Sequence, residues 1–227
     1  MIDAGKQFTI IAMETTLTST PQIIVEPRVI LRDISWETYE RLMKDHEDRS
    51  APRFTYENGT LEIYMPTPKH EKITRFFEIL ISAIAEEREL DIESFGSTTY
   101  KREDLKQGVE PDSCFYIQNA ELIAGTDKLD LDIHPPPDLV VEVDITSPSV
   151  ERFPIYAALG VPEIWQYAGG QVKIYILQNK NYAEAEESRA LPKVTGEVLI
   201  GFLAESQTEK RSVWLKNLRH WTRPAAL

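Results

Sequence analysis

The stretch DLVVEVDITSPS at residues 138–149 places acids inside an apolar run. Side chains alternate between the two faces of a strand, so Asp138, Glu142 and Asp144 share one face with Val140. The opposite face is entirely apolar and consists of Leu139, Val141, Val143 and Ile145. The stretch therefore predicts a core strand with one acid-bearing side and one side that packs on a hydrophobic layer.

A second stretch, VEPDSCFYI at residues 109–117, repeats this arrangement. If it forms one strand, Glu110, Asp112 and Cys114 share a face. Cysteine is among the residue types most often buried, so we expect Cys114 to be a buried, inert thiol. The two stretches together predict two core strands that each carry acids.

The carboxylates of Asp112 and Glu142 need a partner if they are buried, because an isolated buried carboxylate is strongly destabilising. A divalent cation between them would be one such partner. If the two strands instead lie near a sheet edge, the acids would be solvated or paired with Lys and Arg. Spacing alone leaves both interpretations open.

Hydrophobic periodicity and turn residues predict the remaining elements. We expect helices at 33–48, 69–89 and 154–159, a helical end at 195–220, hairpins at 53–65 and 163–177, and further strands at 91–101 and 181–187. The hairpins turn on Asn58-Gly59 and Gly169-Gly170, which tolerate positive φ angles. This succession predicts an α/β or α+β fold, with a mixed central β-sheet flanked by helices.

The length of 227 residues predicts one domain, which we place at 28–227 behind a flexible N-terminal arm at 1–27. No apolar run is long enough to cross a membrane, and we expect a cytoplasmic protein. The net charge of −12 argues against broad, nonspecific coating of DNA. The basic segment 210–223 is either a terminal helix packed by its tryptophans or a local nucleic-acid patch.

Three segments, VEPDSCFYI, PPDLVVEVDITSPS and YAALGVPEIW, resemble the Uma-type restriction endonuclease family of the PD-(D/E)XK nuclease superfamily. The resemblance runs from about residue 35 to about 177 and implies a restriction-endonuclease-like core. It also implies that Asp112 and Glu142 are ligands of Mg²⁺ or Mn²⁺, and that the protein is a metal-dependent endodeoxyribonuclease. In such an enzyme a water activated by the metal attacks a phosphodiester bond of DNA.

The sequence departs from the family pattern at three positions. Asp144 stands where the superfamily usually has a lysine, and Thr55 stands where the family has a glutamate. The family's basic residue corresponds to Arg152, which we interpret as a phosphate clamp because arginine does not readily release a proton. An ion pair of Arg152 with Asp144 or Glu151 is the alternative.

The helix predicted at 69–89 begins with His70 and Glu71, and its helical wheel directs His70 toward the sheet more than Glu71. The family often has a histidine here, so His70 is a further candidate catalytic residue. A histidine that merely satisfies the helix start is the other interpretation.

Two other functions remain open. The departures from the pattern allow a catalytically degenerate nuclease fold that acts as a binding or interaction module, with an exposed edge at GVPEIW (160–165) that would form a homodimer. A glycosidase with paired carboxylates would need similar acid placement, but no aromatic-rich sugar cleft is apparent. Motifs for nucleotide cofactors, zinc fingers and serine hydrolases are absent from the sequence.

Overall fold

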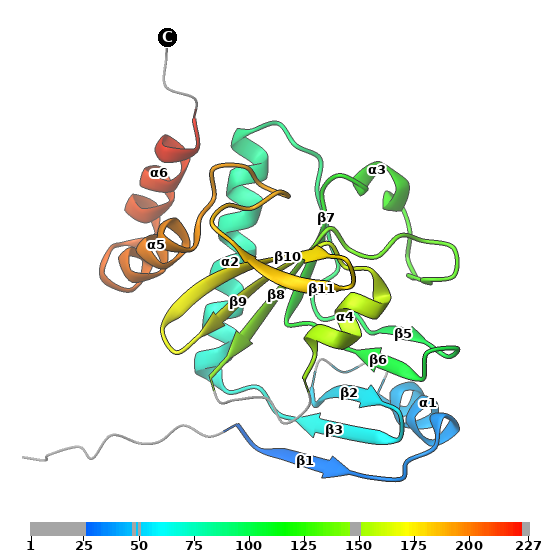
Figure 1. Cartoon of the computed structure of the whole chain (residues 1–227). Helices are drawn as coiled ribbons and strands as arrows, with labels where there is room; N and C mark the ends of the chain where they lie inside the picture. The colour runs from blue at the N-terminus through cyan, green and yellow to red at the C-terminus, as the bar shows by residue number, and fades with distance from the viewer. Residues whose placement is uncertain (1–25, 47–48, 50, 146–150, 224–227) are drawn as a thin grey trace, which may run out of the picture.

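The computed structural model of the chain describes residues 26–46, 49, 51–145 and 151–223. The predicted N-terminal arm lies outside the described residues except for its last two positions. Within the described part, helices and strands build two β-sheets with helices packed against both (Figure 1). The predicted α/β (α+β) class is confirmed.

The larger sheet holds both acid-bearing stretches. Its strand order is β11-β10-β9-β8-β7-β4, and every neighbouring pair is antiparallel except β8 and β9, so the sheet is mixed as predicted. The strands are β4 (Glu93–Ser94), β7 (Ser113–Tyr116), β8 (Leu139–Asp144), β9 (Glu163–Ala168), β10 (Gln171–Gln178) and β11 (Asn181–Ala185). The hairpin between β9 and β10 turns on Gly169-Gly170, as expected.

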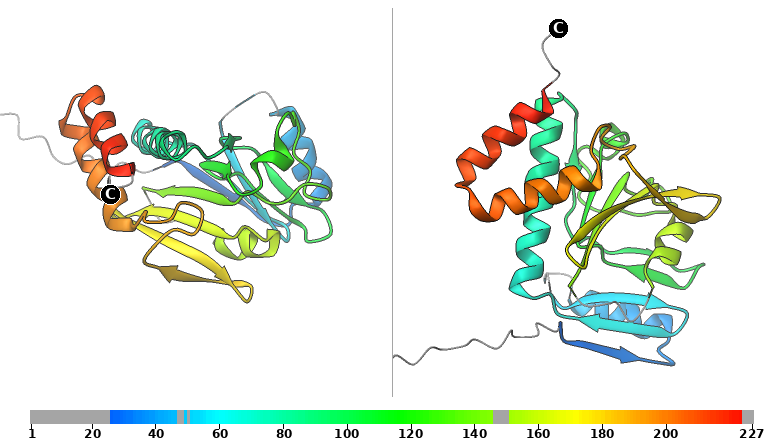
Figure 2. Two further views of the ribbon diagram at one scale, coloured as in Figure 1. Left: turned by 90° about the horizontal axis from the view of Figure 1, so that it is seen from above. Right: turned by 60° about the vertical axis from the view of Figure 1, so that its left-hand side comes forward.

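Helices cover both faces of this sheet (Figure 2). The helices are α2 (Pro68–Glu87), α3 (Ala120–Ile123), α4 (Phe153–Leu159), α5 (Gly196–Thr208) and α6 (Arg211–Thr222). The apolar side of β8, with Leu139, Val141 and Val143, lies in one core with α2, α5 and α6, whereas Val140 lies in the core of the α4 side. The strand alternation read from the sequence of β8 is therefore confirmed.

The start of α2 and the packing of α6 also follow from local sequence. Thr67 caps α2, since its hydroxyl accepts a hydrogen bond from the His70 backbone N–H, and Pro68 follows in the first turn. In α6, Trp214 and Leu218 are buried in the core that contains α2. The basic segment 210–223 is thus a packed terminal helix.

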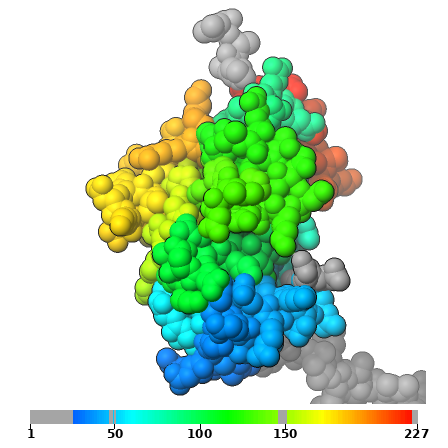
Figure 3. Space-filling view, turned by 90° about the vertical axis from the view of Figure 1, so that its right-hand side faces the viewer, coloured from blue at the N-terminus to red at the C-terminus, as the bar shows by residue number. Residues whose placement is uncertain are grey.

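The smaller sheet has the order β1-β3-β2-β6-β5, and α1 (Trp36–Asp45) packs on it through an aromatic cluster. Its strands are β1 (Arg28–Leu31), β2 (Arg53–Glu57), β3 (Thr60–Tyr64), β5 (Tyr100–Arg102) and β6 (Gln107–Val109). Asn58 and Gly59 have positive φ angles of 45° and 89° in the predicted turn. Figure 3 shows β1 and α1 in blue, below the green segment that follows α2 and includes β5 and β6.

Two predicted strands are wrong because each is divided between the two sheets. The stretch 109–117 ends β6 at Val109 and begins β7 at Ser113, and Pro111, which has no backbone N–H to offer a ladder, lies between them. The stretch 91–101 likewise contributes β4 to the larger sheet and β5 to the smaller one. Glu110 therefore does not share a strand face with Asp112 and Cys114.

The expected exposed edge at GVPEIW is also wrong. Its residues enter β9, which is hydrogen-bonded between β8 and β10, and Val161, Ile164 and Trp165 are buried. The homodimer therefore stays a prediction without the support of an exposed edge at these residues. The single domain at 28–227 also stays a prediction. Among the described residues, no helix is both long and apolar enough to span a membrane.

Candidate active site

Asp112 directly precedes β7, and Glu142 lies on β8, the antiparallel neighbour of β7 in the larger sheet. Ser113 of β7 pairs with Val141 of β8, and continuing this register by one residue places Asp112 opposite Glu142. Residues opposite each other in an antiparallel pair point to the same face. Both side chains are buried, at 1% and 2% exposure. The structure therefore brings together the two acids that the sequence singled out.

Donors from the smaller sheet and from α2 surround the Asp112 carboxylate. The Tyr64 hydroxyl donates to Oδ1 at 2.9 Å, and His70 Nε2 and Arg53 Nη1 lie 2.9 and 3.1 Å from the same oxygen. Oδ2 accepts the Val143 backbone N–H at 2.7 Å. Burial favours the neutral acid, but the contact with His70 and the nearby arginine charges outweigh it and lower the pKa of Asp112.

The Glu142 carboxylate has a different environment. Its Oε1 accepts the hydroxyl of Tyr156, and its Oε2 accepts Nη1 of Arg152. Burial raises the pKa of Glu142 to about 7; the charge of Arg152 opposes this rise and that of Asp112 adds to it. The pKa of Asp112 is thus lowered and that of Glu142 is raised, although the two acids are neighbours. Asp112 has three cationic or hydroxyl groups around one oxygen, whereas Glu142 has one arginine and one tyrosine hydroxyl.

Arg152 connects the two sheets. It is the residue before α4 and is 6% exposed. Besides its bond to Glu142, its Nη2 lies 3.9 Å from Glu62 of β3, and its Cζ lies 4.6 Å above the Tyr64 ring. The prediction that Arg152 forms an ion pair with Asp144 or Glu151 was wrong, since its partners are Glu142 and Glu62. Asp144 accepts a hydrogen bond from Gln166 at 2.6 Å instead.

His70 points into the site, as its place on the helical wheel predicted. Its Nδ1 lies 2.8 Å from Glu26, so the ring bridges two buried carboxylates. Burial lowers the pKa of His70, but the contacts with Asp112 and Glu26 outweigh it and raise the pKa to about 9. Glu71 is 41% exposed and pairs with Arg53 at 3.2 Å, so it lies at the rim.

Four acids and four cations form ion pairs at this junction, within the part of the chain that the structure describes. Each buried acid has at least one cation within ion-pair distance. The acids are Glu26, Glu62, Asp112 and Glu142, and the cations are Arg28, Arg53, His70 and Arg152. When all eight are ionised, their formal charges cancel without an added ion.

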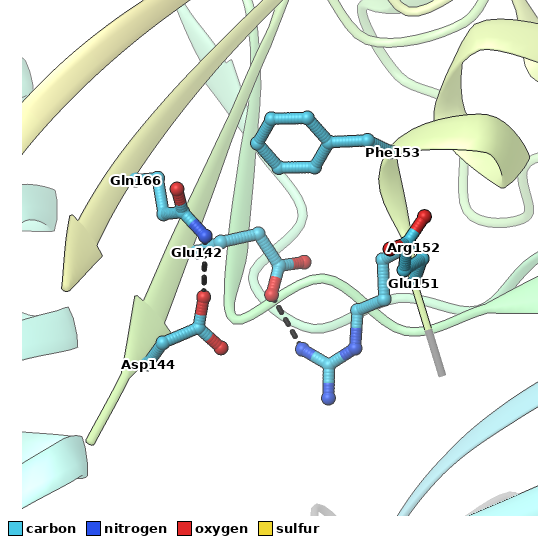
Figure 4. Close-up of a pocket in the computed structure, with 6 residues that line it drawn as sticks. All are labelled: Glu142, Asp144, Glu151, Arg152, Phe153 and Gln166. Atoms are coloured by element: carbon cyan, nitrogen blue, oxygen red, sulfur yellow. Dashed lines mark hydrogen bonds and ion pairs between the residues drawn. The ribbon is translucent and has the colours of Figure 1, made fainter. Parts of the chain in front are cut away.

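A pocket of about 290 Å³ opens beside Glu142. Figure 4 shows the Glu142 and Arg152 side chains meeting there, with the Phe153 ring extending from the start of α4 beside them and Asp144 bonded to Gln166. Asp144 and Glu151 also line it. The pocket gives a small ligand group access to Glu142 and Arg152.

The carboxylates of Asp112 and Glu142 have the chemistry of ligands for a divalent cation. Asp112 and Glu142 are hard oxygen donors, and Mg²⁺ is often held by one or two carboxylates with waters and substrate phosphates as its other ligands. Asp112 Oδ2 and both Glu142 oxygens each accept one of the hydrogen bonds described above, whereas a carboxylate oxygen can accept two. No group of three or more His, Cys, Asp or Glu in the described ranges is arranged to hold a metal. The residues fit a cation shared by two carboxylates, beside the charge of Arg152.

Several residues of the site were not predicted. Tyr156 follows Arg152 by one helical turn, a spacing that places both side chains on one side of α4. Glu62 pairs with Thr55 across β2 and β3, so an acid lies next to the position where the family glutamate was missing. Tyr64, Arg53 and Glu26 gave no local signal, because their partners are distant in the sequence.

Glu110 has a structural role. Its carboxylate accepts the Phe54 backbone N–H and the Thr99 hydroxyl, both at 2.7 Å. It therefore joins β2 to the segment before β5. Cys114 is fully buried, as expected, and burial raises the pKa of its thiol to about 12.

Comparison with known proteins places the chain in a family. A search of curated proteins finds no match. A solved structure from Anabaena variabilis, described as a "putative nuclease belonging to DUF820", is similar at 15% identity and a TM-score of 0.46, covering 72% of this chain and 92% of that one. This likeness is too weak to assign a fold. The profile of the Uma2 family, described as "Putative restriction endonuclease", matches residues 36–205, about three quarters of the chain. The chain therefore belongs to the Uma2 family of restriction-endonuclease-like proteins.

Proposed function

We propose that this protein is a metal-dependent endodeoxyribonuclease whose catalytic centre is the pair Asp112 and Glu142. The observation that carries the proposal is the cross-strand register that puts both buried carboxylates on one face, where a pocket opens beside Glu142. Membership in a family of restriction-endonuclease-like proteins supports DNA as the substrate. Mg²⁺ or Mn²⁺ is the proposed cofactor, since both accept carboxylate oxygens.

Each residue of the site has a proposed role. Asp112 and Glu142 hold the cation, which when bound would polarise a phosphate oxygen and lower the pKa of a coordinated water. His70 and Tyr64 fix Asp112, and Tyr156 fixes Glu142, through the contacts described above. Such contacts limit the rotamers of the two acids before substrate arrives.

Arg152 is proposed to contact the scissile phosphate. Its guanidinium stays charged, and it lies at the wall of the pocket, where a phosphate oxygen can replace one of its carboxylate partners. In hydrolysis the water oxygen bonds to phosphorus, and the bond from phosphorus to the leaving sugar oxygen breaks. Negative charge develops on the phosphoryl oxygens, and a fixed cation stabilises it.

The test is cleavage of plasmid DNA by purified protein with Mg²⁺ or Mn²⁺. We expect nicking or linearisation that requires the ion and falls at least about a hundredfold in Asp112→Ala and Glu142→Gln, as expected for loss of an essential electrostatic group. Glu110→Gln is a matched control, because it removes the charge of a half-buried acid outside the pair. Cleavage that persists undiminished in Asp112→Ala would show a contaminating nuclease.

The second candidate function is a degenerate nuclease fold that binds without cleaving. The internal charge balance favours it, because Arg152 already supplies a cation to Glu142. Calorimetry with Mn²⁺ in the presence of DNA separates the two. Binding that is lost in Glu142→Gln supports the nuclease, and no binding under any condition supports the degenerate fold.

A further inference from the structure

A second groove lies directly beside the catalytic pocket. It has a volume of about 530 Å³ and shares two wall residues, Glu151 and Phe153, with the pocket at Glu142. Because Phe153 immediately follows Arg152, one short segment presents a cation to the pocket and an aromatic ring to both hollows. The two hollows are therefore neighbours, so one extended ligand can contact both of them on either side of Glu151 and Phe153.

The lining of this groove is mostly apolar and has no net charge. Its apolar and aromatic side chains are Leu105, Phe153, Pro154, Ala157, Ala158 and Tyr182. The charged residues are one acid, Glu151, and one base, Lys180, beside the amide of Asn181. This chemistry suits a flat, uncharged ring with polar edges. A site for a phosphate group would be expected to have more than one cation in its lining.

The aromatic wall is held in place before any ligand binds. The Phe153 ring packs edge-on against Tyr175 at 4.9 Å and against Tyr182 at 5.4 Å between ring centroids. The Tyr182 hydroxyl donates to the Val161 carbonyl at 2.6 Å. A ring fixed in this way loses little side-chain entropy when a base stacks on it.

The lysine at the mouth is held by an unusual turn. The hairpin between β10 and β11 turns on Asn179 and Lys180 with φ angles of 48° and 69°, whereas the hairpin between β9 and β10 uses two glycines at the same places. Lysine in the left-handed region is more strained than glycine. The turn keeps an exposed ammonium group next to the groove, where a DNA strand would pass.

We propose that this groove binds one unpaired nucleobase of a DNA strand whose adjacent phosphodiester lies in the catalytic pocket. This inference rests on the proposed function and narrows its substrate. The base stacks on Phe153 and Tyr182, Asn181 meets its polar edge, and Lys180 meets the backbone. The unpaired base belongs either to single-stranded DNA or to a base turned out of a duplex.

The groove can be filled without changing the pocket at Glu142. Ala158 is exposed on α4 and lines only the groove, so Ala158→Trp places an indole where the base would lie. Leu122→Trp, at a position that is 66% exposed on α3, adds the same side chain elsewhere. Affinity for a labelled oligonucleotide is measured by anisotropy without divalent ions, so that cleavage does not interfere.

We expect Ala158→Trp to weaken binding of single-stranded DNA about tenfold, the effect of losing one stacked base, and Leu122→Trp to leave it unchanged. A fully paired duplex of the same sequence distinguishes the two sources. Sensitivity to Ala158→Trp with both DNAs means that a base is turned out of the helix, and sensitivity with the single strand alone means that the substrate is single-stranded. Equal affinities of all three proteins for both DNAs overturn the proposal.

A second measurement uses the unchanged protein and does not depend on how a variant folds. One abasic position is moved along the oligonucleotide, and we expect a loss of about tenfold at one or two adjacent positions only. Uniform affinity along the strand overturns the proposal, as does a wild-type protein that binds no DNA. Position-dependent binding without any cleavage in Mg²⁺ or Mn²⁺ would uphold the groove and overturn the nuclease.

Discussion

At the scale of single residues, the site depends on how each carboxylate is held. Asp112 has a charged histidine and an arginine on one oxygen, whereas Glu142 has one arginine and one tyrosine hydroxyl. These contacts separate the pKa values of two acids that are neighbours across a strand pair. His70 is central to this difference because it bridges Asp112 and Glu26.

His70 predicts a loss of stability at alkaline pH. Its pKa of about 9 in the folded chain exceeds the 6.5 of an ordinary histidine, so the stabilisation is complete below pH 6.5 and is lost as the pH rises through 9. The loss is on the order of 3 kcal/mol. Urea unfolding of wild type and His70→Gln at about pH 6 and about pH 9.5 measures it. If both proteins lose the same stability over this range, His70 is not charged in the fold.

At the scale of elements, α4 places two site residues at once. Arg152 precedes the helix and Tyr156 lies one turn later, and the helix ends at Gly160 with a φ angle of 83°. A left-handed terminal residue is best served by glycine. Pro154 in the first turn and Gly160 after the last turn are the sequence signals for this helix. They therefore also fix the backbone position from which the Arg152 side chain extends.

Replacing Gly160 with alanine tests this placement. We expect Gly160→Ala to destabilise the fold by about 1 kcal/mol, because a side chain is strained at this φ angle. Gly201→Ala is the matched control, since a Cβ there meets no atom within 4 Å and the residue lies inside α5. Alanine should stabilise that helix by up to about 1 kcal/mol. Denaturant midpoints check both, and effects of the same sign would contradict the assignment.

At the scale of the whole molecule, the candidate active site lies where two sheets meet. The smaller sheet supplies Arg53, Glu62 and Tyr64, the larger sheet supplies Glu142, and Asp112 lies on the link between β6 and β7. The resulting balance of buried charge has a consequence for metal binding. A divalent ion added to a neutral cluster leaves excess positive charge, which a phosphodiester of DNA would offset.

Metal affinity should therefore rise when one internal cation is removed. We expect Arg152→Gln to bind Mn²⁺ at least about tenfold more tightly than wild type without DNA, since one carboxylate loses its counter-charge. Arg75→Gln changes the net charge equally at a side chain that is 69% exposed, and should leave the affinity unchanged. Calorimetry measures all three. Equal affinities would mean that Arg152 does not compete with the ion.

Local patterns were sufficient for most of the elements. The Asn58-Gly59 turn, the Gly169-Gly170 turn and the helix α2 were predicted because they depend on neighbours within a few residues. The division of 109–117 at Pro111 was not predicted. Alternation of polar and apolar residues looks the same whether the stretch forms one strand or two strands in different sheets. The resemblance to the nuclease family, and not the spacing of acids along the chain, distinguished Asp112 and Glu142 from other acids.

The sequence by itself determined most of the helices and strands and which face of β8 is apolar. Through the family resemblance it also indicated that Asp112, Glu142, Arg152 and His70 were the residues to examine. Only the tertiary structure decided their partners: Glu26 for His70, Tyr64 and Arg53 for Asp112, and Glu62 for Arg152. The physical reason is that periodicity and capping act over a few residues, whereas buried ion pairs join chain segments whose proximity is set by how two sheets pack.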